Sequence, residues 1–300
     1  MAVPPHTAGA APAGAWTTTI AREEPLVGKV YDGRRHRFAG PDDVFAAIAE
    51  ADFVLLGEKH DNPYHHALQA RALREMLARG KKPAVAFEML DTDQRPAMDA
   101  YLAKKDASAE GFGAAVDWEK RGWPTYAWYA PIVKIALDAH LPIVATNLPR
   151  AELRAIVHDG KLDPARAREL GVDKPLSDVQ AVEVREEMRE THCGQLPEEM
   201  LDPMALAQRA RDGALGAALI AAAHGGPVVL IAGNGHARTD RGVPAYLYAH
   251  AATGARVVSV SFSEVEHGEK EPGPSPYDYV WFTPRATDED PCAKMMHQPR

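Results

Sequence analysis

The chain has 300 residues, which is enough for one large α/β domain or two small ones. Its 34 Lys and Arg against 42 Asp and Glu give a formal net charge of −8, which argues against a nucleic-acid-binding surface, because such a surface needs a basic excess or stripe. Two cysteines cannot build a disulfide scaffold or an all-cysteine zinc site, so the 13 histidines and the carboxylates are expected to carry any metal or acid–base chemistry.

The composition of the two ends of the chain predicts that both lie outside the folded part. Residues 1–25 are rich in Ala, Pro and Gly, and we expect a disordered leader. This stretch lacks a basic n-region and an aliphatic core, so as given it is not a signal peptide. The chain holds no run of 18 apolar residues, which excludes a transmembrane helix. We expect one α/β domain over residues 26–285 and a tail over 286–300.

Between these ends, short apolar runs alternate with helical patterns. The folded part is expected to begin with a hairpin that starts at Lys29 and turns near Asp32-Gly33. The expected core strands cover about residues 53–56, 84–87, 142–146, 227–232 and 256–260, with an edge strand at 277–282. The expected helices cover about residues 41–50, 63–79, 93–104, 126–139, 204–222 and 243–251.

The apolar runs are short and show little polar alternation, which is typical of parallel strands buried on both faces. Their alternation with helices predicts the α/β class, with a mostly parallel sheet flanked by helices. A helical insert at about residues 149–224 is expected between the third and fourth core strands, as a subdomain or lid.

Polar side chains follow the expected strands at the points where those strands end. In an open parallel sheet, ligands bind beyond the carboxyl ends of the strands. We therefore expect one edge of the sheet to gather the polar residues that follow the first four core strands: Glu58, His60, Glu88, Asn147 and His236.

The first of these segments admits two interpretations. Glu58 and His60 can be a pair of metal ligands, or a base with its partner. Alternatively, the loop only caps the next helix, since Asn62 suits an N-cap and Pro63 a first helical position.

Glu88 directly follows an apolar run, so its carboxylate is expected to be half-buried and to need a cation, a metal or hydrogen-bond donors. The alternative is an ordinary salt bridge to an arginine such as Arg150 or Arg238. His236 follows Gly233-Asn234-Gly235, where the glycines allow close backbone approach to a ligand or a tight turn. The segment is neither a P-loop nor a complete dinucleotide-binding fingerprint.

Two further segments are candidates for cofactor contacts. Five aromatic side chains lie within residues 118–129, and they can either stack on a flat cofactor, with Tyr126 or Tyr129 as a ligand of haem iron, or pack a helix start. His192 ends an acidic helical pattern, where it is either a helix cap or an axial or lid ligand.

Several motifs in this order resemble one known family. They are Gly57-Glu58-Lys59-His60, Phe87-Glu88, Pro131-Ile132-Val133, His192-Cys193-Gly194 with Leu196-Pro197-Glu198, Ala207-Gln208-Arg209-Ala210-Arg211-Asp212 and Gly233-Asn234-Gly235-His236. Together they resemble the ChaN family of the haem-binding uptake and Tiki superfamily, which is distantly related to erythromycin esterase-like enzymes. The resemblance covers about residues 40–262.

The resemblance implies a haem-binding protein linked to iron or haem uptake or handling. Haem would lie over the carboxyl edge of the sheet beneath the insert, near Asn147, with its iron bound by Tyr126, Tyr129 or His192. A propionate would pair with Arg150 or Arg238. The expected partners are haem or another small molecule, a second copy of the chain around haem, and a membrane-associated uptake system; no nucleic acid is expected.

An alternative is a hydrolase, an esterase or peptidase, that uses a divalent metal ion in the same pocket. The resemblance to related branches of the superfamily, which look like metal-dependent hydrolases, implies a catalytic or metal-binding role for His60, Glu88 and His236, with Glu58 beside them. These four residues would hold the metal or act as a base and its orienting partners. Members of the ChaN family are often exported or lipid-anchored, whereas this chain shows no lipobox cysteine, so both a cytoplasmic and an exported location stay open.

Overall fold

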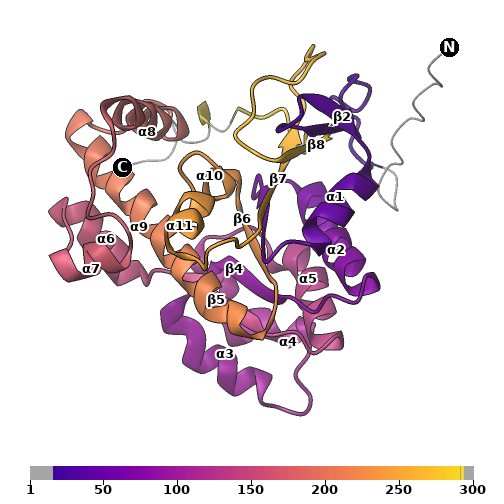
Figure 1. The fold of residues 1–300 in the computed structure, drawn as a ribbon, viewed down its shortest axis with the longest axis horizontal. Coiled ribbons are helices and arrows are strands. Elements are labelled where there is room, and N and C mark those ends of the chain that lie inside the picture. The colour runs from indigo at the N-terminus through magenta and orange to yellow at the C-terminus, as the bar shows by residue number, and fades with distance from the viewer. Residues whose placement is uncertain (1–15, 291, 294–300) are drawn as a thin grey trace.

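The computed structural model describes residues 16–290 and 292–293. Eight strands form one sheet in the order β2-β1-β8-β7-β3-β6-β4-β5 (Figure 1). The strands are β1 (Val30–Asp32), β2 (Arg37–Ala39), β3 (Phe53–Glu58), β4 (Ala84–Asp91), β5 (Ile143–Asn147), β6 (Val228–Gly233), β7 (Val257–Glu264) and β8 (Tyr279–Thr283). The pairs β1–β2 and β1–β8 are antiparallel and the other five pairs are parallel, so the predicted mostly parallel α/β sheet is confirmed.

The helices cover both faces of this sheet and extend to one side of it (Figure 1). They are α1 (Pro41–Ala49), α2 (Pro63–Ala78), α3 (Arg95–Leu102), α4 (Ala109–Ala115), α5 (Tyr126–Asp138), α6 (Arg150–Asp159), α7 (Pro164–Glu169), α8 (Asp178–Thr191), α9 (Glu198–Ala222), α10 (Asn234–Ala237) and α11 (Val243–His250). The described residues also contain three 3₁₀ helices: η1 (Thr92–Gln94), η2 (Trp118–Arg121) and η3 (Ala223–Gly225). Among the described helices, none combines the length and apolar character needed to cross a bilayer.

Alternate side chains of each central strand bury against opposite helical layers. In β3, Val54 and Leu56 belong to the core that includes α1, α2 and α5, whereas Phe53 and Leu55 belong to the core that includes α9 and α11. All six residues of β3 and of β6 are buried. This double burial explains why the runs are apolar without alternation, as in parallel sheets covered on both sides.

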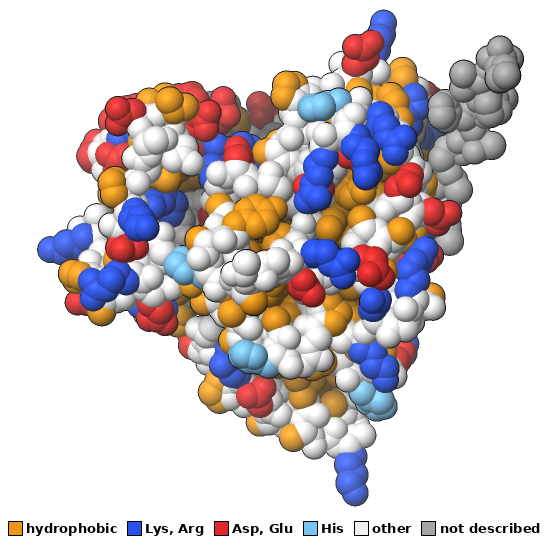
Figure 2. Space-filling view, in the orientation of Figure 1, with side chains coloured by type: hydrophobic (Ala, Val, Ile, Leu, Met, Phe, Trp, Pro, Cys, Tyr) orange, Lys and Arg blue, Asp and Glu red, His pale blue; other side chains and the backbone are white. Residues whose placement is uncertain are grey.

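The helices α6, α7, α8 and α9 occupy the chain between β5 and β6 and lie to the left of the sheet in Figure 1. Small apolar clusters hold them together, one around Leu170 and Ala207 and another around Met188 and Leu201. Helix α8 carries many carboxylates, and Figure 2 shows acidic side chains gathered over it at the upper left. These four helices form one wall of the cavity described below.

The structure differs from the sequence-based expectations at the sheet edge. We expected residues 277–282 to form an edge strand, but β8 lies between β1 and β7, so this expectation is wrong. The reason is that the β1–β2 hairpin, which was correctly expected, adds to the sheet beyond β8.

The ends of the chain also differ from the expectations. Residues 1–15, 291 and 294–300 of the expected leader and tail lie outside the described residues. Within the described part, Thr18 donates its backbone N–H to the hydroxyl of Tyr64 in α2 at 2.6 Å, and Trp16 packs edge-on against the Tyr64 ring. In the tail region, Ala286 donates its backbone N–H to Glu264 at 2.9 Å, and Cys292 forms a disulfide with Cys193.

Candidate functional site

A cavity of about 910 Å³ opens beyond the carboxyl ends of the central strands. Its floor comes from the strand ends and the segments that follow them, and contains Glu58, His60, Glu88, Gly233 and His236. The insert forms an apolar wall from α6, α8 and α9, made by Leu153, Val157, Met188, Met204 and Ala207. Near β7 and the segment after β8 the lining is polar, with Ser263, Glu264, Glu266 and Arg285.

The sequence explains locally why β3 delivers its polar residues to this floor. Gly57 lies against α10, and a Cβ at this position would meet Asn234 at 2.5 Å, so only glycine permits the close approach. Asn62 caps α2 by accepting the backbone N–H of Tyr64 at 2.9 Å, with Pro63 in the first turn, as expected. The loop 59–62 therefore both caps a helix and holds His60 beside the cavity, so the two interpretations of this segment are compatible.

Glu58 is buried and is held by three side chains. Tyr129 donates its hydroxyl to Glu58 Oε1 at 2.7 Å, and His60 donates from Nδ1 to the same oxygen at 2.8 Å. His66 Nδ1 lies 2.8 Å from Glu58 Oε2. Burial alone would raise the pKa of Glu58, but the two histidines outweigh it and lower the pKa to about 2. Glu58 is therefore a fixed anion that orients His60.

Glu88 is the centre of the second group of contacts. Its Oε2 accepts the backbone N–H of Gly233 at 2.7 Å, and Arg211 donates to its Oε1. His236 Nε2 lies 3.3 Å from Oε1, and His60 Nε2 lies 3.7 Å from Oε2. Burial would raise the pKa of Glu88, but His236, Arg211 and His60 hold it well below its usual range.

His236 completes the network on the insert side. Its Nδ1 lies 2.6 Å from Asp212 Oδ1 in α9, and it is also in contact with Gln208. Burial would lower the pKa of His236, but Glu88 and Asp212 outweigh it and raise the pKa to about 9. At neutral pH His236 is therefore protonated and shared between two carboxylates.

The floor consists of two histidines, each oriented by a carboxylate, on either side of Glu88. Such pairs are the parts needed for general acid–base chemistry. In residues 16–290 and 292–293, no group of three or more His, Cys, Asp or Glu side chains is arranged to hold a metal ion. The four side chains expected as metal ligands contact one another, Tyr129, Arg211 and Asp212.

Apart from His192, the residues predicted as cofactor contacts are not among those that line the cavity. Tyr126 and Tyr129 are buried in the core, where Tyr126 donates its hydroxyl to the carbonyl of Ala109 at 2.6 Å. Arg150 donates to the carbonyl of Arg121.

Arg238 pairs with Asp240 at 2.7 Å, so neither Arg150 nor Arg238 is the salt-bridge partner of Glu88. Arg211 holds that place instead, and Asn147 accepts a hydrogen bond from Arg211 Nε at 3.3 Å.

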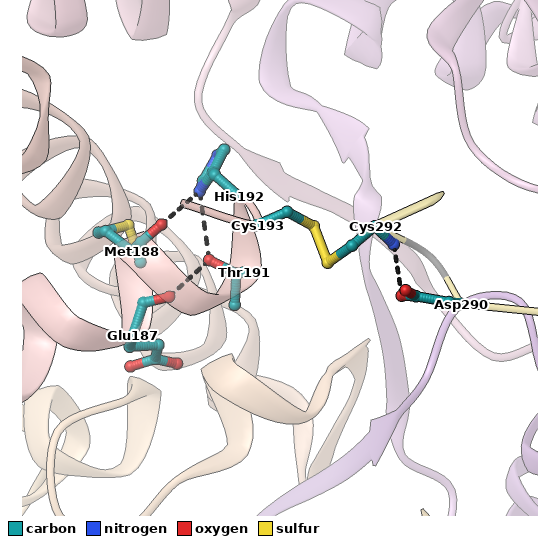
Figure 3. Close-up of a disulfide and its surroundings, with 7 residues drawn as sticks. All are labelled: Glu187, Met188, Thr191, His192, Cys193, Asp290 and Cys292. Atoms are coloured by element: carbon teal, nitrogen blue, oxygen red, sulfur yellow. Dashed lines mark hydrogen bonds between the residues drawn. A yellow bond between two sulfur atoms is a disulfide. The ribbon is translucent and has the colours of Figure 1, made fainter. Parts of the chain in front are cut away.

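His192 does line the cavity, at the C-terminal end of α8 (Figure 3). Its Nδ1 lies 2.8 Å from the backbone carbonyl of Met188, which can only accept, so Nδ1 carries the proton. In the neutral ring Nε2 is then unprotonated and available as a ligand. The next residue, Cys193, forms a disulfide with Cys292, which the sequence analysis did not anticipate.

Sequence reasoning also missed the contribution of α9. Gln208, Arg211 and Asp212 all face the buried histidine and glutamate of the floor. Their spacing of three and four residues puts them on one face of the helix, and polar side chains grouped on a face of an otherwise Ala- and Leu-rich helix were the available signal.

A second cavity of about 180 Å³ adjoins the large one and shares Glu187, Gln208 and Gly235 with it. Asp212 lines it as well.

Comparisons with known proteins agree with this architecture. Residues 44–247 match the family described as haem-binding uptake, Tiki superfamily, ChaN. No curated protein shows a significant match. A structure of cofacial haem binding to ChaN of Campylobacter jejuni is similar to this one with a TM-score of 0.68 at 23% identity, covering 84% of this chain and 95% of that chain.

Weaker similarities extend to two further proteins. The type III effector HopBA1 gives a TM-score of 0.45 at 13% identity, over 81% of this chain and 92% of its own. The erythromycin esterase EreC, in its open conformation, gives 0.43 at 14% identity, over 79% of this chain and 77% of its own. At these values only the Campylobacter structure bears on the fold.

Proposed function

The chain belongs to the ChaN family of the haem-binding uptake and Tiki superfamily, and from that premise we propose that it binds haem in the large cavity and takes part in haem or iron uptake or handling. The observation that carries the proposal is His192. Its ring faces the cavity with Nδ1–H donated to a backbone carbonyl, which leaves Nε2 as a nitrogen ligand.

The residues of the cavity fit a flat, mostly apolar ligand with two anionic groups. A volume of about 910 Å³ lies at the upper end of the range for cofactor sites. The apolar wall from the insert suits a porphyrin face. No tyrosine is among the residues that line the cavity, so a histidine is the better candidate for the iron ligand in this chain.

Two cations at the mouth of the cavity are candidates for the propionates. Lys59 is 37% exposed and lies 2.8 Å from Glu264, and Arg285 pairs with Glu266. Arginine and lysine bind carboxylates through charge-assisted hydrogen bonds, which are stronger than neutral ones. These two replace Arg150 and Arg238 in the proposal.

The test is a titration of the full chain with haemin, followed by absorption. We expect a Soret band that shifts and saturates at a fixed ratio of haem to chain. His192→Ala is expected to weaken binding and change the spectrum. The matched control is His224→Ala, because His224 is exposed and lies just before β6, at the opposite end of the strands from the cavity. A wild-type spectrum that stays that of free haemin would refute the proposal.

We include in the proposal a homodimer around haem, because the Campylobacter protein is described as binding haem cofacially. Sedimentation with and without haemin tests it. A mass that stays that of one chain when haem is saturating would contradict the dimer and leave haem binding itself untouched.

A second candidate function is hydrolysis of an ester or amide at the cavity floor. It is favoured by one observation, the two carboxylate-oriented histidines on either side of Glu88. Here His60, which lines the cavity and lies beside Glu88, would act as the general base that takes a proton from water. Protonated His236 would act as the general acid that donates a proton to the leaving group. Turnover of model esters that His60→Gln does not reduce would exclude it.

A further inference from the structure

The Cys193–Cys292 disulfide joins the insert to the segment that follows β8 (Figure 3). Both of these parts of the chain contribute residues to the lining of the large cavity. Next to Cys193, the last residues of α8 contribute Met188, Thr191 and His192 to the lining. The end of β7 and the segment after β8 contribute Glu264 and Arg285. The two cysteines are 99 residues apart in sequence, so the disulfide is a long-range covalent connection between these two segments.

The C-terminal end of this link is anchored to the sheet before it reaches Cys292. Asn62 donates from Nδ2 to the carbonyl of Pro284 at 3.1 Å, and Ala286 donates its N–H to Glu264 at 2.9 Å. Further along, Asp288 lies 3.0 Å from His267 Nε2. The segment after β8 is therefore tied to the sheet at Pro284 and Ala286, a few residues before Cys292.

The other end of the link is the turn that carries His192. Cys193 has a φ of +57°, in the left-handed region that a residue with a Cβ rarely adopts, and Gly194 follows at +66°. The turn is closed by the N–H of Cys193 to Glu190 at 2.9 Å and the N–H of Gly194 to Arg189 at 2.8 Å. His192 directly precedes this turn, and its Nδ1 bonds the Met188 carbonyl at 2.8 Å. The disulfide therefore restrains the backbone of the residue next to His192, at a position whose conformation is unfavourable.

We propose that the Cys193–Cys292 disulfide positions His192 as the iron ligand, so that its reduction speeds the release of haem. This inference rests on the proposed haem-binding function. Both cysteines are partly exposed, so a thiolate can reach the bond. A dithiol reductant supplies two electrons to the S–S bond, each cysteine sulfur gains one proton, and the reductant leaves as its own disulfide.

The proposal links haem affinity to the redox state of the surroundings. Disulfides persist in oxidising compartments and are reduced in the cytosol. With the bond intact, the ligand is pre-organised, and the cavity holds haem tightly. With the bond reduced, His192 must be ordered on binding, which costs affinity.

The experiment compares the haem-loaded full chain with its Cys292→Ser variant. Haem dissociation is measured by transfer to excess apomyoglobin, and iron ligation by electron paramagnetic resonance. We expect a dissociation rate constant about tenfold higher in Cys292→Ser, the order expected for losing the pre-organisation of one side chain, with a weaker histidine-ligation signal. Wild-type protein that is reduced with a phosphine, alkylated and freed of reagent should behave in the same way, which covers a variant that folds poorly.

The decisive control repeats Cys292→Ser in the His192→Ala background. If the disulfide acts through His192, it changes nothing further there; an equal acceleration in that background means a general structural role and overturns the proposal. Wild type that binds haem, with Cys292→Ser identical in rate and spectrum, also overturns it and leaves the proposed function standing. Wild type that binds no haem is instead the failure of the proposed function.

Discussion

Glu88→Gln is the substitution whose effect the structure determines most closely. The change keeps the size of the side chain and one oxygen that can accept the N–H of Gly233, which Glu88 accepts at 2.7 Å. It removes the negative charge that faces Arg211 and the protonated ring of His236. The buried ring of His236 then keeps only Asp212 as a paired carboxylate, and Arg211 loses its carboxylate partner.

The expected cost follows from the burial of these groups. Glu88 is 1% exposed and His236 is 3% exposed, so solvent cannot replace the lost charge. Removing one partner of a buried ion pair destabilises proteins by about 3–5 kcal/mol. We expect the free energy of unfolding to fall by about this amount, and the pKa of His236 to fall from about 9 because burial is opposed by one carboxylate fewer.

Urea unfolding at pH 7, followed by circular dichroism, measures the first effect, and NMR of the histidine rings measures the second. The exposed Glu271→Gln is the matched control, since it removes the same charge far from the network. A loss below about 1 kcal/mol, together with an unchanged His236 pKa, would show that Glu88 is not the centre of a charged network.

Three other changes test the same structure. The folded-state pKa of His236, about 9, exceeds its ordinary value of 6.5, so its stabilising contribution is complete below pH 6.5 and is lost as the pH rises through 9; a urea midpoint that does not fall over this range would contradict the assignment. Tyr129→Phe removes the 2.7 Å hydrogen bond to the buried Glu58 and should lower the free energy of unfolding by about 1.5–3 kcal/mol. Denaturant titration measures this loss, and an unchanged free energy of unfolding would contradict it. Gly213→Ala would place a Cβ against the backbone carbonyl of Leu170 and should lower the free energy of unfolding by about 1–3 kcal/mol. An unchanged melting temperature would show that α7 and α9 can move apart without cost.

The fold class was predictable because burial on both faces leaves a direct mark on the sequence. The apolar runs of β3 and β6 carry no polar alternation; β3 ends in Glu58, and Asn234 and His236 directly follow β6 at the same edge of the sheet. That positional rule is enough to bring Glu58, Glu88 and His236 together before any side-chain contact is known. The position of β8 in the strand order was not predictable. It depends on the pairing of β1 with β8, and this pairing joins residues that are far apart in the sequence.

The contacts between side chains within the site were harder to predict from the sequence, for the same reason. Arg211 is 123 positions from Glu88, and nothing in the spacing of either motif indicates which arginine fills that place. Tyr129 was expected as a cofactor contact, but its ring is buried in the core and its hydroxyl satisfies Glu58. With only two cysteines, the Cys193–Cys292 pairing is the one available, yet whether the sulfurs meet depends on the path of the chain after β8.

The most direct test of the account is the absorption and magnetic resonance spectrum of the full chain with one equivalent of haemin, measured for wild type and for His192→Ala. The account predicts tight, saturable binding with a histidine-ligated iron in wild type, and loss of that ligation in His192→Ala but not in His224→Ala. Haemin that remains spectrally free with the wild-type chain, or a ligation signal that survives His192→Ala unchanged, would contradict it.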